Sequence, residues 1–514
     1  MMNFIIFALA AVFIGFSSST EDGFSQLFYD NKETFVDRRI VFENPLPKWL
    51  RGSLVRTGPG MFGNGPRNFT HAFDGFSKIH SWKFYGNGSA SFSTNFVRSS
   101  VYNNSIKINN IDNYLTFEKP TPPFSLMQEE IGILKGMDNM NINVYRFLNS
   151  GTGQYEYATL SDTWKMYQID PLTVGTISPV NAMKPSVPEN FVSLMSSAHP
   201  VPEYGTGHHF TFLTSLSVIP GIQSRLSVMR IKSTFERELV AQWGVDKAPY
   251  MHSFSVTPNY VILLAAPYFV NVEWMLKNAD AYSGLEWFPS EKANFYVIEI
   301  KTGKVTTIST PITNPTHHAN AYEEDNKIII DICTSKDPFF ATAFEVGVIR
   351  DVNKRNKVDF TLLFSRYTID LESKTAMETK FPANSSFPFL NYFDIPAINE
   401  NYRHKKHCFV YGVSFKKDFK SFARTALVKK DTCGNNKDNA WSLDGHFPME
   451  MWFVPRSNST GEDDGVLLTP VLDGAKKESY LMILNATTMT VMNRGYLNTS
   501  LPFTIHGRFF PDVV

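Results

Sequence analysis

The stretch Glu324-Asp325-Asn326-Lys327-Ile328-Ile329-Ile330-Asp331-Ile332 shows most clearly how this chain is organised. A polar turn leads directly into a run of β-branched residues, which is typical of a strand entered through a tight turn. Similar runs recur along the whole chain, among them Lys78–Phe84, His209–Leu216, Arg225–Ile231, Tyr260–Ala265, Ala293–Glu299 and Ser479–Leu484. Many short strands separated by turn residues predict an all-β sandwich, barrel or propeller.

The number of strands favours a propeller among these three architectures, because a sandwich rarely holds so many. The chain has 514 residues and contains no Pro/Ser-rich linker that would divide it. Long helical patterns are few: Ala266–Asp280 and Phe339–Val352 have partial helical character and are interpreted as inserted loops. We therefore expect one large propeller domain over residues 20–514, with long loops on one face.

The composition excludes two broad classes of protein. Basic and acidic side chains balance at 49 each, whereas a nucleic-acid-binding protein usually has a basic excess or patch. Aromatic residues make up 14% of the chain, including 44 Phe, and this much apolar side chain must be buried. Disorder is therefore excluded for most of the chain, and no nucleic-acid partner is expected.

The N-terminus carries a separate signal. Phe4–Phe16 is an apolar run of 13 residues, too short to span a membrane, and it is followed by small and then polar residues. We interpret residues 1–19 as a secretory signal peptide cut near Ser19; an uncleaved membrane-surface anchor is the alternative. A secreted or lumenal glycoprotein also fits the seven Asn-x-Ser/Thr sequons, at Asn68, Asn87, Asn103, Asn384, Asn458, Asn485 and Asn498.

The three cysteines are too few for a disulfide framework. Cys408 opens one apolar run and Cys433 closes the next, so the two would lie near each other at the open end of a hairpin. The sequence leaves open whether they pair. Cys333, inside the isoleucine-rich run, is expected to be a buried free thiol.

Histidines are the remaining candidates for chemistry, since the chain lacks a phosphate-binding loop and a Gly-x-Ser-x-Gly nucleophile motif. The local motif His404-x-x-His407-Cys408 lies in a basic run and is interpreted as part of an exposed, solvated loop. The adjacent His208 and His209 are interpreted as a turn that enters a strand.

A more widely spaced set fits a propeller better. His199, His252, His317 and His506 each lie beside apolar or small residues at the edge of a predicted strand, at intervals of 53, 65 and 189 residues. A propeller brings the same edge of every blade to its central axis, so one histidine per blade could meet around one metal ion. Four neutral imidazoles without a thiolate suit Fe(II) or another borderline divalent ion.

The sequence around these histidines and elsewhere resembles a known family, the carotenoid cleavage oxygenases, which include animal β-carotene oxygenases and the retinoid isomerase of the eye. The resemblance extends from about Val41 to Phe510 and rests on several motifs in order: Leu50-Arg-Gly-Ser-Leu-Val-Arg-Thr-Gly-Pro-Gly60, His71-Ala-Phe-Asp-Gly75, Ile79-His-Ser-Trp-Lys-Phe84, Tyr250-Met-His-Ser-Phe254, His317-His-Ala-Asn-Ala-Tyr-Glu-Glu324 and Glu462-Asp-Asp-Gly-Val-Leu-Leu468.

The resemblance implies a seven-bladed β-propeller, with a cap of long loops and short helices over the iron face, that holds non-haem Fe(II) through four histidines. They match His199, His252, His317 and His506, while His318 is expected to be structural. Carboxylates that hydrogen-bond three of these histidines match Asp162, Asp394 and Glu450. The family usually has Glu at all three positions, so the shorter Asp implies either a closer backbone or a bridging water.

The implied activity is that of a dioxygenase, in which Fe(II) and O2 cleave a double bond of a carotenoid or apocarotenoid to two carbonyl products. Ser161, Phe254 and Ile505 are expected to line the substrate cavity. The resemblance also implies two alternatives: a retinyl-ester isomerohydrolase and a non-catalytic carotenoid-binding propeller. Substrate uptake could involve association with a membrane surface, although Thr116–Phe124 lacks the cysteine found in the corresponding segment of vertebrate relatives.

Overall fold

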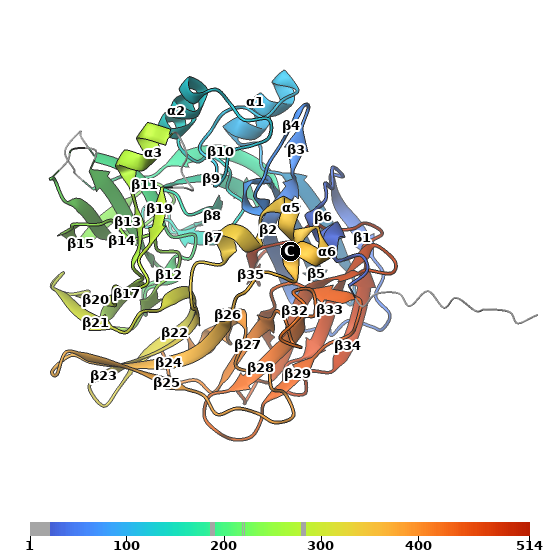
Figure 1. The fold of residues 1–514 in the computed structure, drawn as a ribbon. Coiled ribbons are helices and arrows are strands. Elements are labelled where there is room, and N and C mark those ends of the chain that lie inside the picture. Colours follow the sequence, from blue (N-terminus) through green and yellow to red (C-terminus); the bar gives the residue numbers. More distant parts are fainter. Residues whose placement is uncertain (1–20, 186–190, 218, 220, 279–283) are drawn as a thin grey trace, which may run out of the picture.

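The computed structural model describes residues 21–185, 191–217, 219, 221–278 and 284–514, so the predicted signal peptide lies outside the described residues. Seven antiparallel sheets of four or five strands surround a common centre (Figure 1). This arrangement is a seven-bladed β-propeller, and the propeller predicted from the sequence is confirmed.

The blades follow one another along the chain, except that the first blade also contains the last strand. Blade one contains β1 (Phe35–Ile40), β2 (Arg51–Met61), β5 (Phe76–Tyr85), β6 (Ala90–Phe96) and β35 (His506–Phe510). Blade two contains β7 (Asn143–Leu148), β8 (Tyr155–Leu160), β9 (Lys165–Asp170) and β10 (Gly175–Asn181), and blade three contains β11 (Phe191–Ser196), β12 (Val201–Pro202), β13 (His209–Ser217), β14 (Ser224–Ile231) and β15 (Arg237–Val245). Blade four contains β16 (Ser255–Val256), β17 (Tyr260–Ala265), β20 (Ala293–Glu299) and β21 (Val305–Thr310).

Blades five to seven complete the ring. Blade five contains β22 (Asn314–Glu324), β23 (Lys327–Ser335), β24 (Leu362–Asp370) and β25 (Thr375–Lys380). Blade six contains β26 (Asp394–Ala397), β27 (Phe409–Ser414), β28 (Ala426–Asp431) and β29 (Asn439–Trp441). Blade seven contains β30 (His446–Pro448), β31 (Trp452–Pro455), β32 (Gly465–Asp473), β33 (Glu478–Asn485) and β34 (Val491–Tyr496). Two small ribbons, β3 (Gly63–Asn64) with β4 (Arg67–Asn68) and β18 (Tyr268–Val270) with β19 (Leu285–Trp287), lie outside the blades.

Strand β35 closes the ring by pairing with β2, with Thr57 opposite His506 and Ser53 opposite Phe510. The first blade therefore joins the two ends of the chain, and opening the ring would break a complete strand ladder. This closure also places His506 at a fixed register on the innermost part of the blade.

The stretch 324–332 forms the hairpin of β22 and β23. Asp325 and Asn326 both have positive φ (51° and 60°), the conformation that a two-residue hairpin turn requires and that Asp and Asn tolerate. Ile328, Ile330 and Ile332 pack in one cluster with Ile262 and other residues of the fourth blade.

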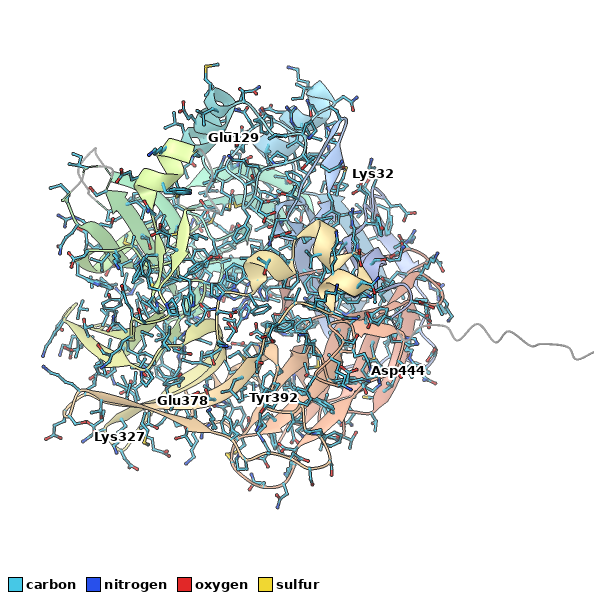
Figure 2. All side chains as sticks on the ribbon, viewed as in Figure 1. Lys32, Glu129, Lys327, Glu378, Tyr392 and Asp444 are labelled. Atoms are coloured by element: carbon cyan, nitrogen blue, oxygen red, sulfur yellow. A yellow bond between two sulfur atoms is a disulfide. The ribbon has the colours of Figure 1, made fainter. Side chains whose placement is uncertain are left out.

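The opposite face of β23 is buried as well, because the sixth blade covers it. Ile329 is 9% exposed, and Asp331 is buried between Arg366 and His407. Burial on both faces explains why the strand is a continuous apolar run instead of an alternating one. In Figure 2 side chains fill the space between blades, and Lys327 at the hairpin turn lies at the outer edge.

The helices are short and lie within the connections between strands. They are α1 (Ser100–Ile108), α2 (Leu126–Lys135), α3 (Val272–Asn278), α4 (Phe340–Ala343), α5 (Val346–Ile349) and α6 (Val352–Arg355), with 3-10 turns at Phe24–Phe28, Ala72–Asp74 and Glu400–Tyr402. The two segments predicted to have partial helical character contain α3, α4 and α5. Among the described residues, none of these helices has the length and apolar content needed to cross a bilayer.

Candidate metal centre

The four predicted histidines meet at the centre of the propeller. His199 precedes β12, His252 precedes β16, His317 lies in β22 and His506 opens β35, so each comes from a different blade. One ring nitrogen of each lies within 4.8 Å of the others. Successive Nε2 atoms are 3.0 Å apart from His199 to His252, 3.1 Å from His252 to His317 and 3.2 Å from His317 to His506.

Three carboxylates bind the outer nitrogens of these rings. The Nδ1 atom of His252 is 2.6 Å from Asp162, that of His317 is 2.9 Å from Asp394, and that of His506 is 2.7 Å from Glu450. A carboxylate accepts a hydrogen bond, so each Nδ1 carries the proton and each Nε2 presents a lone pair toward the centre.

The donor set fits a divalent metal ion. Two Nε2 atoms about 3 Å apart both reach a common ion at the usual metal–imidazole distance of roughly 2.0–2.1 Å. Lone pairs that face one another at this distance repel unless a cation lies between them. His199, His252, His317 and His506 are therefore the residues that could hold a metal, and the three carboxylates could fix their orientation.

Burial and neighbouring charge set the protonation of the cluster. Burial lowers the pKa of His506 to about 4, even though Glu450 opposes the shift. Burial and the other three histidines hold the pKa of His199 well below its usual value. Both imidazoles are therefore neutral near pH 7, as metal ligands must be.

Two of the carboxylates, Asp394 and Glu450, remain charged although they are buried. Burial alone would raise the pKa of Asp394, but His317 and the hydrogen bond from Thr316 outweigh it, and the net shift is downward. The pKa of Glu450 is also lowered on balance, because His506 and Arg56 outweigh the effect of burial. Burial alone would lower the pKa of His252, but the charge of Asp162 and its hydrogen bond to the ring outweigh burial and raise that pKa.

The two shorter carboxylates reach their histidines directly, so neither contact needs a bridging water. Asp162 is held in place by the backbone N–H of Ala198, at 3.0 Å from its Oδ1, and by the hydroxyl of Tyr250, at 3.3 Å from its Oδ2. Thr316 donates its hydroxyl to Asp394 at 2.8 Å.

Several supporting residues were not predicted from the sequence. Arg56 has no exposed surface and forms a 2.8 Å ion pair with Glu450, which places a guanidinium directly behind His506. Cys333 is a buried free thiol, as predicted, and burial together with the neighbouring Asp394 raises its pKa. Arg56 lies inside the Leu50–Gly60 motif, which is the signal that could have identified it.

The other histidines lie outside this cluster. His318 is hydrogen-bonded through Nδ1 to Ser255 Oγ at 2.8 Å, and His209 is the first residue of β13, as the predicted turn requires. The interpretation of His404 and His407 as part of an exposed loop is wrong, because they are only 7% and 1% exposed. The lysines between them, Lys405 and Lys406, face the solvent instead.

A cavity of about 240 Å³ lies on one side of the cluster and is lined by His252, His317 and His506. Its walls are largely aromatic: Phe73 stacks on Phe344 with ring centres 5.0 Å apart. The connections that contain Phe117 and α4 contribute to these walls, so loops and short helices cover the histidines on this side.

The predicted cavity residues divide between two cavities. Ser161 and Ile505 line the large apolar cavity, as expected. Phe254 does not; it lines a smaller cavity of about 80 Å³ that reaches His199, His317 and His506. Met251–Phe254 lie outside the strands, so the alternation of a strand does not fix which cavity each of them faces.

The structure pairs Cys408 with Cys433, a point that the sequence left open. The disulfide joins the residue before β27 to a residue just after β28, at the open end of that hairpin. Its Cα atoms are 5.0 Å apart, within the range that a disulfide can bridge.

Comparisons with known proteins find relatives that match nearly the whole chain. A family model described as retinal pigment epithelial membrane protein matches residues 31–511. The chain is 27% identical to the β,β-carotene 15,15′-dioxygenase of Gallus gallus, covering 95% of this chain and 98% of that protein. It is 24% identical to the mitochondrial carotenoid-cleaving dioxygenase of Macaca fascicularis, with 90% of each chain covered.

Solved structures show the same architecture. A variant of Synechocystis apocarotenoid oxygenase superimposes with a TM-score of 0.77 at 22% identity, covering 96% of this chain and 99% of that one. The cobalt-substituted form of the same enzyme gives a TM-score of 0.75 at 21% identity, with the same coverage.

Proposed function

The chain belongs to the family of the retinal pigment epithelial membrane protein, and from this premise we propose that it is a non-haem Fe(II)-dependent dioxygenase that cleaves a double bond of a carotenoid or apocarotenoid. The observation that carries the proposal is the cluster of four histidines beside an apolar cavity rich in aromatic side chains. Relatives that cover nearly the whole chain are named as carotene dioxygenases, which supports the same reaction class.

His199, His252, His317 and His506 would hold the metal through Nε2. One solved structure is of a cobalt-substituted apocarotenoid oxygenase; our proposal of iron rests on a set of four imidazoles without a thiolate, which suits a borderline divalent ion. Iron bound there would supply the redox chemistry that a reaction with O2 requires. Asp162, Asp394 and Glu450 fix the ring orientation and keep each Nδ1 protonated.

The cavity walls would orient the substrate and exclude water. Phe73, Phe117 and Phe344 present flat apolar surfaces, which match a rigid polyene that offers no hydrogen bonds. Binding along these walls would bring one double bond close to His252, His317 and His506. The carbonyl products would form where bulk water has little access.

The isomerohydrolase alternative remains, because the matching family includes the retinal pigment epithelial membrane protein itself. Analysis of the products under air and under argon distinguishes the possibilities. We expect aldehyde or ketone fragments that form only under air. Isomerised alcohol formed equally without O2 would indicate the isomerohydrolase, and an unchanged substrate would indicate a carotenoid-binding protein.

We also propose that the protein is secreted or lumenal and glycosylated. All seven sequon asparagines lie at the surface, five of them exposed and two half-buried, and the Cys408–Cys433 disulfide suits an oxidising compartment. After expression in animal cells, the mature chain should begin near Thr20 and lose mass on glycosidase treatment. An intact Met1 and an unshifted mass would contradict this.

Association with a membrane surface is a further part of the proposal. Helix α2 exposes four apolar side chains: Leu126 is 56% exposed, Met127 67%, Ile131 41% and Leu134 82%. The helix lies against the segment of Tyr114, which lines the large cavity, so a polyene could pass from a bilayer into the protein at this point. Replacing Met127 and Leu134 by Glu should reduce co-sedimentation with liposomes while micellar substrate is still cleaved. Equal sedimentation of both proteins would refute this association.

A further inference from the structure

A second, smaller cavity also reaches the histidine cluster. The two cavities share His317 and His506, while His252 lines the first and His199 the second. The smaller cavity measures about 80 Å³ and contains charged side chains, among them Glu400, Arg403 and Arg508. The proposed reaction with a polyene uses none of these three side chains.

Arg508 is the cation in this cavity that forms no close ion pair among the described residues; Glu400 and Glu450 act on it only from farther away. It lies two residues after His506 on β35, so the two side chains leave the strand on the same face. Its Nη2 donates to the hydroxyl of Tyr145 at 2.6 Å, and its guanidinium lies 3.9 Å above that ring. Its Nε is buried and has no hydrogen-bond partner in the described part of the chain, and no described carboxylate lies within 4.0 Å.

The carboxylates that face the cavity already have cationic partners. Glu400 accepts two hydrogen bonds from Arg403, at 2.7 and 3.1 Å. Glu450 accepts from Arg56 and from the His506 ring. These two acids are therefore balanced by Arg403 and Arg56, and the charge of Arg508 remains.

A second buried nitrogen faces the same cavity without a partner. His318 lines the cavity, its Nδ1 contacts the Ser255 hydroxyl at 2.8 Å, and its Nε2 is buried and unbonded within the described residues. If Ser255 donates to Nδ1, the imidazole carries its proton on Nε2 and offers a second donor. Buried donors of this kind are costly unless a ligand or water satisfies them.

We propose that this cavity binds a small monovalent anion, of the size of a halide or a small planar oxyanion, through the Arg508 guanidinium and the His318 Nε2–H. One water needs only about 10–15 Å³, so the cavity has room for an ion of this size. The anion would neutralise the charge of Arg508, close to the histidine cluster that could hold a metal cation. This site is separate from the substrate cavity and does not depend on the proposed reaction.

Bromide provides a direct probe, because its anomalous scattering identifies it in a crystal. Crystals of the full-length protein soaked in sodium bromide should show a bromide in the cavity, within hydrogen-bond distance of Arg508. The peak should persist in Arg508→Lys and in the control Arg456→Gln, which changes a half-exposed arginine elsewhere, and it should disappear in Arg508→Gln. A cavity that contains only water, or a bromide that persists in Arg508→Gln, would overturn the proposal.

A solution measurement excludes binding that occurs only at crystal concentrations. Melting curves at constant ionic strength, with gluconate replaced stepwise by chloride, compare an anion that fits with one that is too large. A ligand that binds the folded state raises the melting temperature in a saturable way. We expect a saturable rise for the wild type and for Arg456→Gln, and its loss in Arg508→Gln. A linear or identical response in all three proteins would refute the site.

Discussion

Histidines contact carboxylates both in the central cluster and at His407, but only the central cluster could bind a metal. In the central cluster, the acids occupy Nδ1 of His252, His317 and His506 and leave each Nε2 directed at a common centre. His407 instead has Nε2 3.0 Å from Asp331 and Nδ1 3.1 Å from the Asn320 side chain, so a polar side chain lies close to each of its nitrogens.

The difference shows what distinguishes a metal ligand from a structural histidine. A carboxylate contact alone does not identify a ligand, because Asp331 binds His407 as closely as Asp394 binds His317. The deciding feature is a free nitrogen that meets other free nitrogens. Removing residues from either group therefore tests the assignment.

The largest effect is expected from His506→Ala. The substitution removes one of the four nitrogens, and its backbone at the start of β35 still pairs with β2. Iron bound per chain should fall to near zero, and cleavage of the polyene should be abolished. Metal analysis and product chromatography check this, with circular dichroism to show that the propeller persists. Normal iron content in a folded variant would show that His506 is not a metal ligand.

Glu450→Gln should have the next largest effect. The amide keeps the size of the side chain but loses the charge that orients His506 and neutralises the fully buried Arg56. Such supporting residues typically contribute about 10–100-fold to metal affinity or activity, and we expect a loss in this range. Glu462→Gln is the matched control, since this acid binds the backbone of Cys408 and Phe409 instead. Equal iron affinity in wild type and Glu450→Gln would contradict the assigned role.

Thr316→Val should have a smaller effect. It removes the hydroxyl that donates to Asp394 at 2.8 Å while the shape of the side chain is kept. Because Thr316 acts on His317 only through Asp394, iron affinity should fall by less than about 10-fold, the lower end of the loss expected for Glu450→Gln. Thr316→Ser should retain most of the affinity, and titration with Fe(II) or Co(II) measures both. No difference between the Val and Ser variants would show that the hydroxyl does not hold Asp394.

His407→Ala should leave iron binding unchanged and lower stability. It leaves Asp331 paired with Arg366 alone in a buried position, which costs about 1–3 kcal/mol. Denaturant unfolding and metal analysis of the same preparation measure both quantities. Loss of iron at unchanged stability would contradict the assignment of His407 as a structural histidine.

The sequence predicted the parts of this structure that depend on periodicity and motif order. Strand runs and turns such as Asp325-Asn326 identified the propeller, and strand-edge positions identified the four histidines. The roles of Arg56 and Thr316 could not be read in the same way, because each depends on which blade its side chain faces. The basic run was misread because Lys405 and Lys406 dominate its composition while the histidines that flank them turn inward.

The adjacent pair His317 and His318 gives the most direct test of the central claim, that four histidines from four blades form one metal site. The two residues are neighbours in β22, yet His317 points to the cluster and His318 to Ser255. Iron per chain should be measured for His317→Ala and His318→Ala alongside a melting curve for each. We predict that His317→Ala loses its iron and that His318→Ala keeps it. Iron retained in His317→Ala but lost in His318→Ala would contradict the assignment.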